Sequence, residues 1–472
     1  MRSDRIVPLI IAVALFMENM DSTVIATSLP VIATDIGANP LELKLAVTSY
    51  LLSLAIFIPA SGWTADRFGA RTVFRTAIAV FMLGSIGCAL SSSLSDFVIA
   101  RIVQGMGGAM MTPVGRMVLV RSISKRDLVN AMAWVTTPAL IGPVLGPPVG
   151  GFITTYATWH WIFIINVPIG LVGIVLANRY IDDLRAETRE RFDIFGMVLA
   201  GLGIAGVAFG LSVLGLNFLP WTAVASLVIG GICFIAAYLV HARYTENPAL
   251  DLTLFRLPTF FSSVIGGFVF RLGLGALPFL LPLMLQVGFG MSPFQSGMIT
   301  FATALGAMGM KWATSTILRR FGFRIILTTN AVISSVFLAV CAGFTATTPI
   351  AIMVTLLLVG GFFRSLQFTS INTIAYAEVE SHRVSRATAL VSVGQQLAVS
   401  TGVAVGALAV ELSVYFKGTG ILEASDFPPA FLAVAAISAL SVFIFARLPS
   451  DAGAEMANRL HKQIDTVEPK VG

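Results

Sequence analysis

Charged residues are scarce in this sequence, and their scarcity excludes a water-soluble globular protein. Asp, Glu, Lys and Arg together make up 11% of the 472 residues, whereas 56% are hydrophobic. A soluble domain carries about 25% charged residues. The mean hydropathy of +0.89 agrees with a chain that lies mostly in lipid.

Residues that form disulfides or bind metals are also few. Cys88, Cys233 and Cys341 each stand alone in an apolar run, so we expect neither a disulfide framework nor a zinc site. The four histidines show no metal-ligand spacing; they are His160, His241, His382 and His461. The sequence has no G-x-x-x-x-G-K-[ST] loop, which excludes an ATP-driven pump. We therefore expect no enzyme activity, no metal and no cofactor.

Long apolar runs, in contrast, are abundant. Fourteen of them are long enough to cross the ~30 Å hydrocarbon core of a membrane as helices. The runs lack the period-2 alternation of a membrane β-barrel. The first run continues to Pro30 without a small-residue cleavage site, so we do not read it as a removed signal peptide. We predict an all-α polytopic membrane protein with helices at 6–28, 44–64, 73–92, 96–119, 129–153, 160–180, 194–214, 221–241, 259–285, 294–317, 324–344, 349–372, 387–410 and 428–446.

Basic residues are distributed unevenly between the predicted loops. Of 30 Lys and Arg residues, 23 lie in loops on the side of the N-terminus, five lie in helices, and only Lys44 and Lys417 lie on the opposite side. Because loops rich in Lys and Arg stay in the cytoplasm, we predict cytoplasmic termini in the cell inner membrane. The basic residues form no single patch, so we expect no nucleic acid partner.

A short internal repeat relates the two ends of the chain. ADRFGAR at 65–71 matches LRRFGFR at 318–324 at four of seven positions, with an offset of 253. The same offset relates the starts of the 6–28 and 259–285 helices. Repeated halves with a site between them are typical of transporters. We predict a 6+2+6 arrangement of fourteen helices, with a first bundle at 1–181, two inserted helices at 182–258, a second bundle at 259–448 and a cytoplasmic tail at 449–472.

Five motifs make the chain resemble a known family. They are MDSTVIATSLP (20–30), GWTADRFGAR (62–71), RIVQGMGGA (101–109), GPVLGPPVGG (142–151) and WHWIFIINVPIG (159–170). Their order and spacing resemble the major facilitator superfamily, in its fourteen-spanner drug:proton antiporter branch of the bacterial multidrug-resistance type. The sequence departs from that pattern at Ala26, where Asn is usual, and at His160, where Arg is usual. Arg319 also replaces the Asp of the first loop copy.

Two of these motifs have a mechanical interpretation. Asp66 is expected to face the N-terminus of a neighbouring helix, while Arg67 and Arg71 pair with acids or headgroups and so lock one conformation. We assign this gating role to Gly62, Asp66, Arg67, Gly69 and Arg71. The antiporter motif allows close helix packing and a kink through Gly142, Pro143, Gly146, Pro147, Gly150 and Gly151.

Five cations lie inside predicted helices, where a charge at the bilayer centre costs about 2.5–3.5 kcal/mol. Such residues usually face the interior of the bundle. The resemblance implies that the helices at 6–28, 96–119, 259–285 and 349–372 line a central cavity. Arg116 and Lys311 could instead extend to the headgroups. The expected substrate-cavity residues are Gln104, Arg116, Arg271, Lys311, Arg364, Gln367 and Asn372.

Glu18 and Asp21 lie one helical turn apart in the first apolar run. A desolvated carboxylate beside an arginine is balanced between its protonated and ionised forms, so it can load a proton on one side and release it on the other. We predict that Asp21, Glu18 and Arg101 couple transport to protons, the role of Arg101 being implied by the resemblance. A purely structural Arg101 stays open, as does a Glu18 that pairs with Arg271 or lies near the outer rim.

These features predict a secondary-active exporter of drugs that is driven by inward proton movement and works by alternating access. Because embedded cations outnumber embedded acids five to two, an exporter of a small organic anion such as citrate is the alternative. A transporter-like sensor is less favoured because the tail is too short for a signalling domain. A passive channel is disfavoured by the gating loop and the repeat. We expect a monomer in the lipid bilayer whose partners are protons and a small-molecule substrate.

Overall fold

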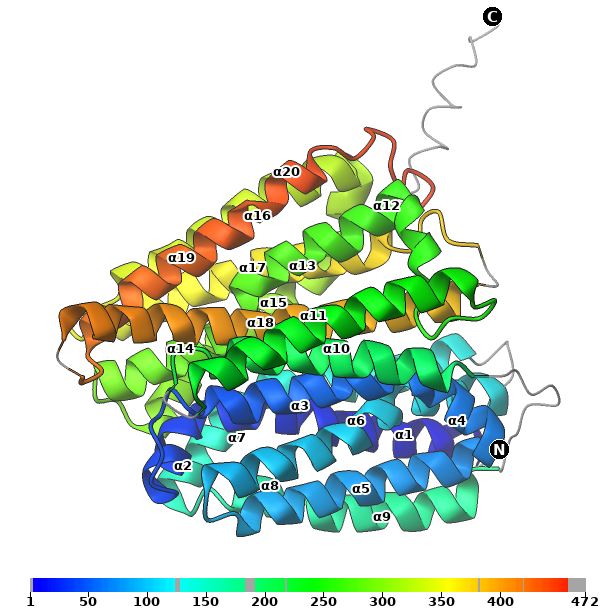
Figure 1. Cartoon of the computed structure of the whole chain (residues 1–472), viewed down its shortest axis with the longest axis horizontal. Coiled ribbons are helices and arrows are strands. Elements are labelled where there is room, and N and C mark those ends of the chain that lie inside the picture. The colour runs from blue at the N-terminus through cyan, green and yellow to red at the C-terminus, as the bar shows by residue number, and fades with distance from the viewer. Residues whose placement is uncertain are drawn as a thin grey trace, which may run out of the picture.

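The computed structural model describes residues 3–123, 128–182, 192–216, 219–380, 383–418 and 420–456, which contain helices and connecting turns but no strand (Figure 1). Helices are expected here because a chain in lipid must satisfy every backbone hydrogen bond internally. Several predicted residues lie outside this described part: Arg2, Lys125, Arg126, Arg185, Arg189, Arg191, His382, Arg459, His461, Lys462 and Lys470.

The helices up to residue 244 follow the first eight predicted runs. They are α1 (Ser3–Val24), η1 (Ile25–Thr27), α2 (Leu29–Asp35), α3 (Lys44–Phe57), η2 (Ile58–Ala60), α4 (Ser61–Phe68), α5 (Ala70–Leu90), α6 (Leu94–Ser122), α7 (Leu128–Tyr156), α8 (Trp161–Ile164), α9 (Asn166–Tyr180), α10 (Ile194–Val213) and α11 (Trp221–Tyr244).

The remaining helices follow the other six runs. They are η3 (Leu252–Arg256), α12 (Pro258–Phe261), η4 (Ser262–Gly266), α13 (Gly267–Gly275), α14 (Leu277–Leu283), η5 (Met284–Gly288), α15 (Pro293–Phe321), α16 (Phe323–Val340), η6 (Cys341–Gly343), α17 (Ile350–Ile374), α18 (Val384–Lys417), η8 (Ala424–Asp426), α19 (Phe427–Ala439) and α20 (Ser441–Phe445). The turns η4 and η5 are π-helical.

Twelve helical stretches of the described residues are long and apolar enough to cross a membrane. They coincide with twelve of the fourteen predicted runs. The other two runs coincide with α7 and α15, which are 29 residues long each but do not belong to these twelve. The helical class and the positions of the runs are therefore confirmed, and the count of fourteen spans stays a prediction.

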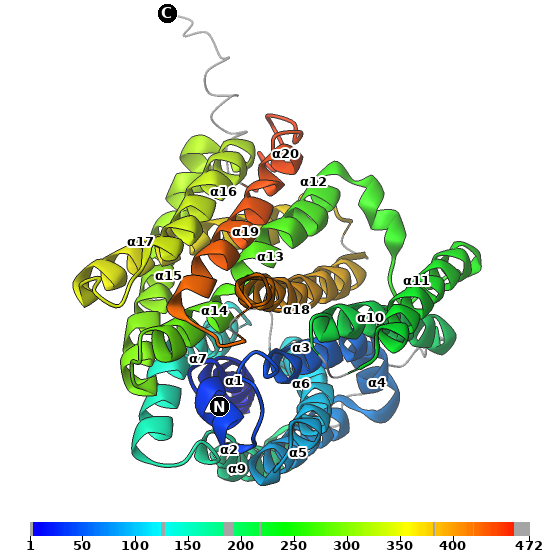
Figure 2. The ribbon, with the colours of Figure 1, turned by 60° about the vertical axis from the view of Figure 1, so that its left-hand side comes forward.

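The two predicted bundles contact each other through equivalent helices. The second helix of the first predicted bundle, α3, packs on α18, the fifth of the second; conversely, α7 packs on α15. The inserted helices α10 and α11 pack on each other, and α10 also contacts α3 and α18 (Figure 2). Each predicted bundle thus uses its second and fifth helices to contact the other.

The two copies of the repeated loop have the same backbone conformation. Gly69 precedes α5 with φ of 89° and ψ of 132°, and Gly322 precedes α16 with φ of 78° and ψ of 166°. Positive φ with extended ψ is accessible to glycine at little cost. The sequence repeat therefore corresponds to a repeated helix-to-helix bend.

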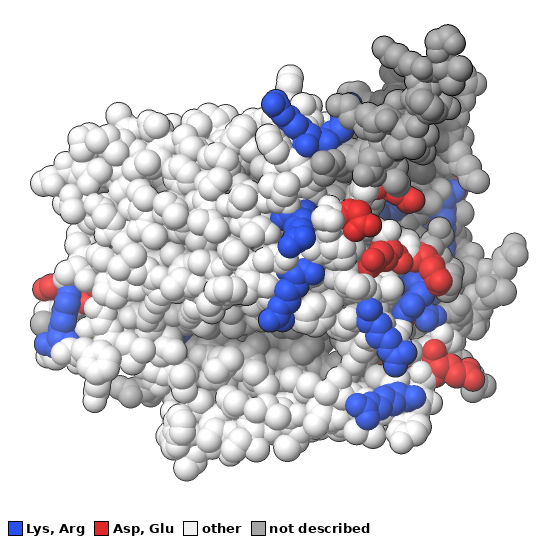
Figure 3. Space-filling view, turned by 90° about the horizontal axis from the view of Figure 1, so that it is seen from above, with Lys and Arg blue, Asp and Glu red and all other residues white. Residues whose placement is uncertain are grey.

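The two ends of the helix bundle differ in charge. We call the end where the described chain begins and finishes the proximal end, and the opposite end, which carries α2, the distal end (Figure 1). Charged side chains gather toward the proximal end in Figure 3, with a small group at the distal end and an apolar surface between them. Lys44 is the first residue of α3, where the 44–64 helix was predicted to begin, and its side chain is fully buried.

Several polar interactions join the first and second predicted bundles toward the distal end. Gln286 Nε2 donates to the Thr27 carbonyl oxygen at 2.8 Å, and the Phe294 amide donates to Thr155 Oγ1 at 3.0 Å. Lys44 forms an ion pair with Glu411 across the same junction. Toward the proximal end the helices α16, α19 and α20 diverge from α5 and α9 (Figure 1).

The segment before α12 is fixed to the start of α18 by an ion pair outside the spans. Asp251 is buried and lies 2.8 Å from the Arg383 guanidinium, and it accepts hydrogen bonds from the Thr253 amide and hydroxyl. Burial raises the pKa of the Asp251 carboxyl, but the hydrogen bonds from Thr253 and Arg383 and the Arg383 charge outweigh that effect. The pKa of Asp251 therefore lies below its usual value.

Candidate functional site

Asp21 lies at the centre of a buried polar network between α1, α6 and α9. Arg101 Nη1 is 2.8 Å from Asp21 Oδ2, and both side chains are at most 1% exposed. Gln104 Nε2 and Asn166 Nδ2 each donate to Asp21 Oδ1 at 2.8 Å. The carboxylate thus receives one cationic and two amide donors, which is the pairing that a buried charge requires.

Helical spacing explains part of this arrangement. Arg101 and Gln104 are three residues apart, so they share one face of α6, and Arg101 also donates to the Gln104 amide oxygen. Ser85 of α5 accepts from Gln104 at 2.8 Å and from Asn166 at 3.2 Å. Gln104, which we assigned to the substrate cavity, is therefore joined to the predicted proton-coupling residues.

Glu18 lies beside this network and has a different environment. It accepts a hydrogen bond of 2.6 Å from Thr112 Oγ1, and the charge of Arg116, one turn further along α6, acts on it. The Tyr50 ring lies under the Arg101 guanidinium, 4.2 Å from its carbon, while the Tyr50 hydroxyl is buried with no hydrogen-bond partner among the described residues. A Cβ at Gly108 would lie 3.2 Å from that hydroxyl and 3.7 Å from Glu18 Cγ.

Arg271 is buried on α13, with 4% of its surface exposed, and does not contact Glu18 in this structure. It donates to Asn372 Oδ1 at 2.7 Å, and its guanidinium lies over the Phe368 ring at 5.2 Å. No carboxylate of the described residues forms an ion pair with it, and its Nε has no partner there. Arg271 and Asn372, which were both expected in the substrate cavity, therefore lie together. The alternative pair of Glu18 with Arg271 is absent among the described residues, because Glu18 bonds Thr112 and Arg271 bonds Asn372.

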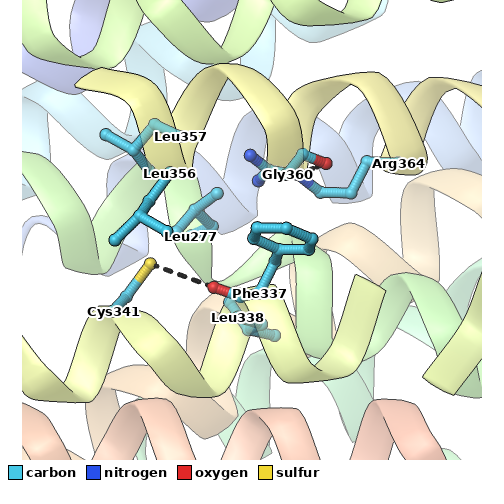
Figure 4. Close-up of a pocket in the computed structure, with 8 residues that line it drawn as sticks. All are labelled: Leu277, Phe337, Leu338, Cys341, Leu356, Leu357, Gly360 and Arg364. Atoms are coloured by element: carbon cyan, nitrogen blue, oxygen red, sulfur yellow. Dashed lines mark hydrogen bonds between the residues drawn. The ribbon is translucent and has the colours of Figure 1, made fainter. Parts of the chain in front are cut away.

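Arg364 lies in a small pocket between α14, α16 and α17 (Figure 4). Its Nε donates to the Gly360 carbonyl oxygen at 3.1 Å, and its Nη2 donates to Thr303 Oγ1 of α15 at 3.3 Å. Phe337, Cys341 and Leu277 also line the pocket. Within the part of the chain that the structure describes, Arg364 has no acidic ion-pair partner either.

The other predicted cavity residues have different surroundings. Gln367 is fully buried, accepts from Asn330 Nδ2 at 3.0 Å and donates to the Leu327 carbonyl oxygen at 2.9 Å, so it joins α17 to α16. Arg116 and Lys311 are exposed, and Lys311 precedes Trp312, which is 91% exposed. The structure does not bring these three residues together with Arg271.

The loop motif forms a cluster at the proximal end. Asp66 lies 2.7 Å from the Arg121 guanidinium, near the C-terminal end of α6. The Arg67 guanidinium lies over the rings of Trp63 and Phe68. The remaining motif residues are Gly62, which faces Met117, Gly69 at the bend, and Arg71, whose Nε is buried without a partner in the described chain.

The antiporter motif brings backbones into contact. A Cβ at Gly146 would lie 2.0 Å from Thr23 Oγ1, and one at Gly150 would lie 2.3 Å from the Val24 carbonyl oxygen, both on α1. Gly142 faces the same helix, while a Cβ at Gly151 would lie 2.4 Å from the Pro293 carbonyl oxygen. The prolines Pro143 and Pro147 lie inside α7. One helix thus contacts both the Asp21 helix and the second bundle.

Sequence reasoning missed Tyr50, Ser85, Thr112 and Asn166. Asn166 stood inside the quoted WHWIFIINVPIG motif as an amide in an apolar run, and that is the signal that could have identified it. The network offers a carboxylate, amides and hydroxyls, a chemistry suited to holding and moving protons. Among the described residues, no group of three His, Cys, Asp or Glu side chains could hold a metal ion.

Comparisons with known proteins find one matching family model and similar relatives. The model of the Major Facilitator Superfamily matches residues 11–193 and 263–466. The provisionally named multidrug resistance protein MdtD of Salmonella typhimurium is 38% identical over 456 residues, covering 95% of each chain, and that of Salmonella heidelberg is equally similar.

Solved structures share the fold at low sequence identity. A D-xylose-proton symporter superposes with a TM-score of 0.67 at 14% identity and covers 95% of this chain and 98% of that one. The human organic anion transporter MFSD10 superposes with a TM-score of 0.58 at 15% identity and covers 94% and 99%. These likenesses bear on the fold alone.

Proposed function

The chain belongs to the Major Facilitator Superfamily, and we propose that it is a proton-coupled antiporter that exports drugs or small organic compounds by alternating access. Multidrug export is suggested by the name of the MdtD relatives. The observation that carries proton coupling is the Asp21–Arg101 ion pair, which is buried within membrane-spanning helices and completed by Gln104 and Asn166. The free energy comes from the proton gradient, without a cofactor.

Protonation of Asp21 changes the energy of this network. Removing the charge of one partner leaves a buried, unpaired arginine, and breaking a buried pair in this way costs about 3–5 kcal/mol. A conformation that gives Arg101 water or a substrate group is then favoured. Proton binding at Asp21 therefore shifts the equilibrium between the two orientations of the transporter.

We propose that α7 and α15 are also membrane spans, which gives fourteen helices in a 6+2+6 order. The segments are then 1–181, 182–258, 259–448 and a tail at 449–472. The reciprocal packing of α3 on α18 and of α7 on α15 supports two equivalent halves, as do the matching bends at Gly69 and Gly322. With an even number of spans, both termini lie on the proximal side.

The proximal side carries most of the basic loop residues, and we assign it to the cytoplasm of a cell with the protein in its inner membrane. The distal end then faces outward and is the closed end. We further propose that the protein works as a monomer in the bilayer, with protons and a small-molecule substrate as its partners.

A small organic anion such as citrate is a second candidate substrate. Arg271 and Arg364 are charged, lie in the second bundle and have no carboxylate ion-pair partner in the described chain, whereas Arg101 is neutralised by Asp21. Substrate carboxylates would supply the missing negative charge. This observation favours an anion over a lipophilic cation in that half.

Proton flux in proteoliposomes tests both parts of the proposal. A pH-sensitive dye inside the vesicles would report protons that move when a lipophilic cation or a citrate-like anion is added. We expect substrate-dependent flux in the wild type and its loss in Asp21→Asn. The proton-coupling assignment is wrong if Asp21→Asn retains coupled flux. The anion alternative fails if Arg271→Ala and Arg364→Ala leave anion transport unchanged.

A further inference from the structure

A second buried ion pair lies at the distal junction of the two bundles. Lys44 Nζ is 2.7 Å from Glu411 Oε1, and the two side chains are 0% and 11% exposed. Lys44 begins α3 of the first bundle, and Glu411 lies in α18 of the second. Lys44 Nζ also lies 3.4 Å from the carbonyl oxygen of Leu214, which follows the inserted helix α10. One ammonium group therefore joins three parts of the chain.

Other charged groups of the described chain lie near this pair. Within the described residues, Glu42, just before α3, is a further acid whose charge acts on both Lys44 and Glu411. Lys417 and Asp426, toward the end of α18 and before α19, form their own ion pair at 2.8 Å. The Glu423 side chain caps the turn η8 that Asp426 closes. Neither the Lys417–Asp426 pair nor the Glu423 cap supplies a replacement partner for Lys44.

Glu411 retains an unused acceptor. Its Oε2 is buried and has no hydrogen-bond partner among the described residues. A Cβ at Gly215 would lie 2.3 Å from this oxygen, so the wall beside it is backbone without a side chain. At the distal junction of the two bundles, Glu411 therefore forms an ion pair with Lys44 through Oε1 and can bind a proton at Oε2.

We propose that the Lys44–Glu411 pair is the outer gate and that Glu411 is a second proton-binding site, distinct from Asp21. A proton from the outer solution binds the Glu411 carboxylate, while Lys44 keeps its own proton. Lys44 is then charged and buried without its ion-pair partner, which destabilises the contact between the two bundles at the distal end. Separation of the bundles there exposes Lys44 to water. Loss of the proton restores the ion pair and closes the gate.

Both the inserted helix α10, through Leu214, and the proton gradient, through Glu411, act on this gate. A high proton concentration outside opens the outer side of the transporter, as an exporter that takes up protons from outside requires. The role of the gate in export rests on the proposed antiport function, whereas the gate itself rests on the Lys44–Glu411 ion pair. An experiment can therefore refute the gate without refuting antiport, and the reverse.

Distances between spin labels on the two bundles test the gate without substrate. Thr34→Cys on α2 and Phe416→Cys at the end of α18 place labels on exposed distal positions, in a background where the three native cysteines are replaced by serine. In nanodiscs we expect the long-distance, open population to rise several-fold between about pH 8 and about pH 5. A pH-independent distribution in this otherwise wild-type protein would overturn the proposal.

Three variants separate the gate from general destabilisation. Glu411→Gln is expected to be open at both pH values, and the exchanged pair Lys44→Glu with Glu411→Lys is expected to close again at high pH. Lys417→Gln, which breaks the neighbouring pair, should keep the wild-type response. A Glu411→Gln protein that still closes as pH rises, or an exchanged pair that stays open, would refute the gate. Proton flux in Asp21→Asn vesicles reports independently on the proposed function.

Discussion

Asp21 and Arg271 are both charged and buried, but their surroundings give them different capacities. Asp21 has a cation and two amides within hydrogen-bond distance, so its ionised form is fully paired. Arg271 has one amide oxygen and an aromatic ring, so its charge has no carboxylate partner in the described chain. The first arrangement suits proton exchange, and the second suits recognition of an anionic group.

The amide of Asn166 provides a residue-level prediction. Asn166→Leu removes one donor from Asp21 Oδ1, and the loss of a hydrogen bond to a charged group costs about 1.5–3 kcal/mol. We expect substrate-dependent proton flux to fall about tenfold or more in proteoliposomes. Asn178→Leu on the same helix is the control, because Asn178 is exposed and, among the described residues, accepts a hydrogen bond from Arg75 far from Asp21. Equal flux in the two variants would show that Asn166 does not support the Asp21 site.

At the scale of elements, close contacts between helices depend on particular glycines. The sequence could predict that Gly150 and Gly151 allow close packing, because small residues at short spacing do so in membranes. It could not predict that Gly150 faces α1 and Gly151 faces α15, since the contacted helices are far away in the sequence. The antiporter motif therefore appears in the structure as a junction of three helices.

Replacing Gly150 tests this junction. Gly150→Val places a Cβ 2.3 Å from the Val24 carbonyl oxygen, which the backbone of α1 cannot avoid without moving. We expect a large loss of folded, monodisperse protein in size-exclusion chromatography. Gly230→Val on α11 makes the same change in helix propensity where no atom lies within 4 Å, and it should leave the yield near wild type. Similar losses of folded protein in the Gly150→Val and Gly230→Val variants would show that the effect comes from helix propensity rather than from helix packing.

The Asp251–Arg383 contact predicts a pH dependence of stability. Because the pKa of Asp251 is lower in the folded protein than in the unfolded chain, its stabilising contribution is present above the unfolded pKa and is lost as pH falls through the folded one. Asp251→Asn should lower the melting temperature at neutral pH, for a loss of about 1.5–3 kcal/mol. The difference from wild type should shrink on acidification below about pH 4. A difference that stays constant as pH falls would contradict this role.

At the scale of the whole molecule, hydrophobic length predicted the helices well because each span must satisfy its own backbone. The sequence repeat predicted two related halves, and the structure adds matching bends at Gly69 and Gly322. The partners of buried side chains could not be predicted in the same way. Gln367 was expected to line the substrate cavity, and its hydrogen bond with Asn330 of the preceding helix α16 could not be predicted from the sequence. Lys44 was placed at the outer end of the predicted 44–64 helix, but its partner Glu411, 367 residues away, could not be predicted. Such long-range pairs depend on the relative positions of the helices, which local sequence patterns do not determine.

The direction of proton movement under a substrate gradient tests antiport itself. Proteoliposomes loaded with substrate, diluted into substrate-free buffer at equal pH, would be followed with a pH-sensitive dye inside. Antiport requires the interior to become more acidic as substrate leaves, and Asp21→Asn should abolish that acidification. An interior that becomes more alkaline would indicate symport, and substrate efflux with no pH change would show that transport is not coupled to protons.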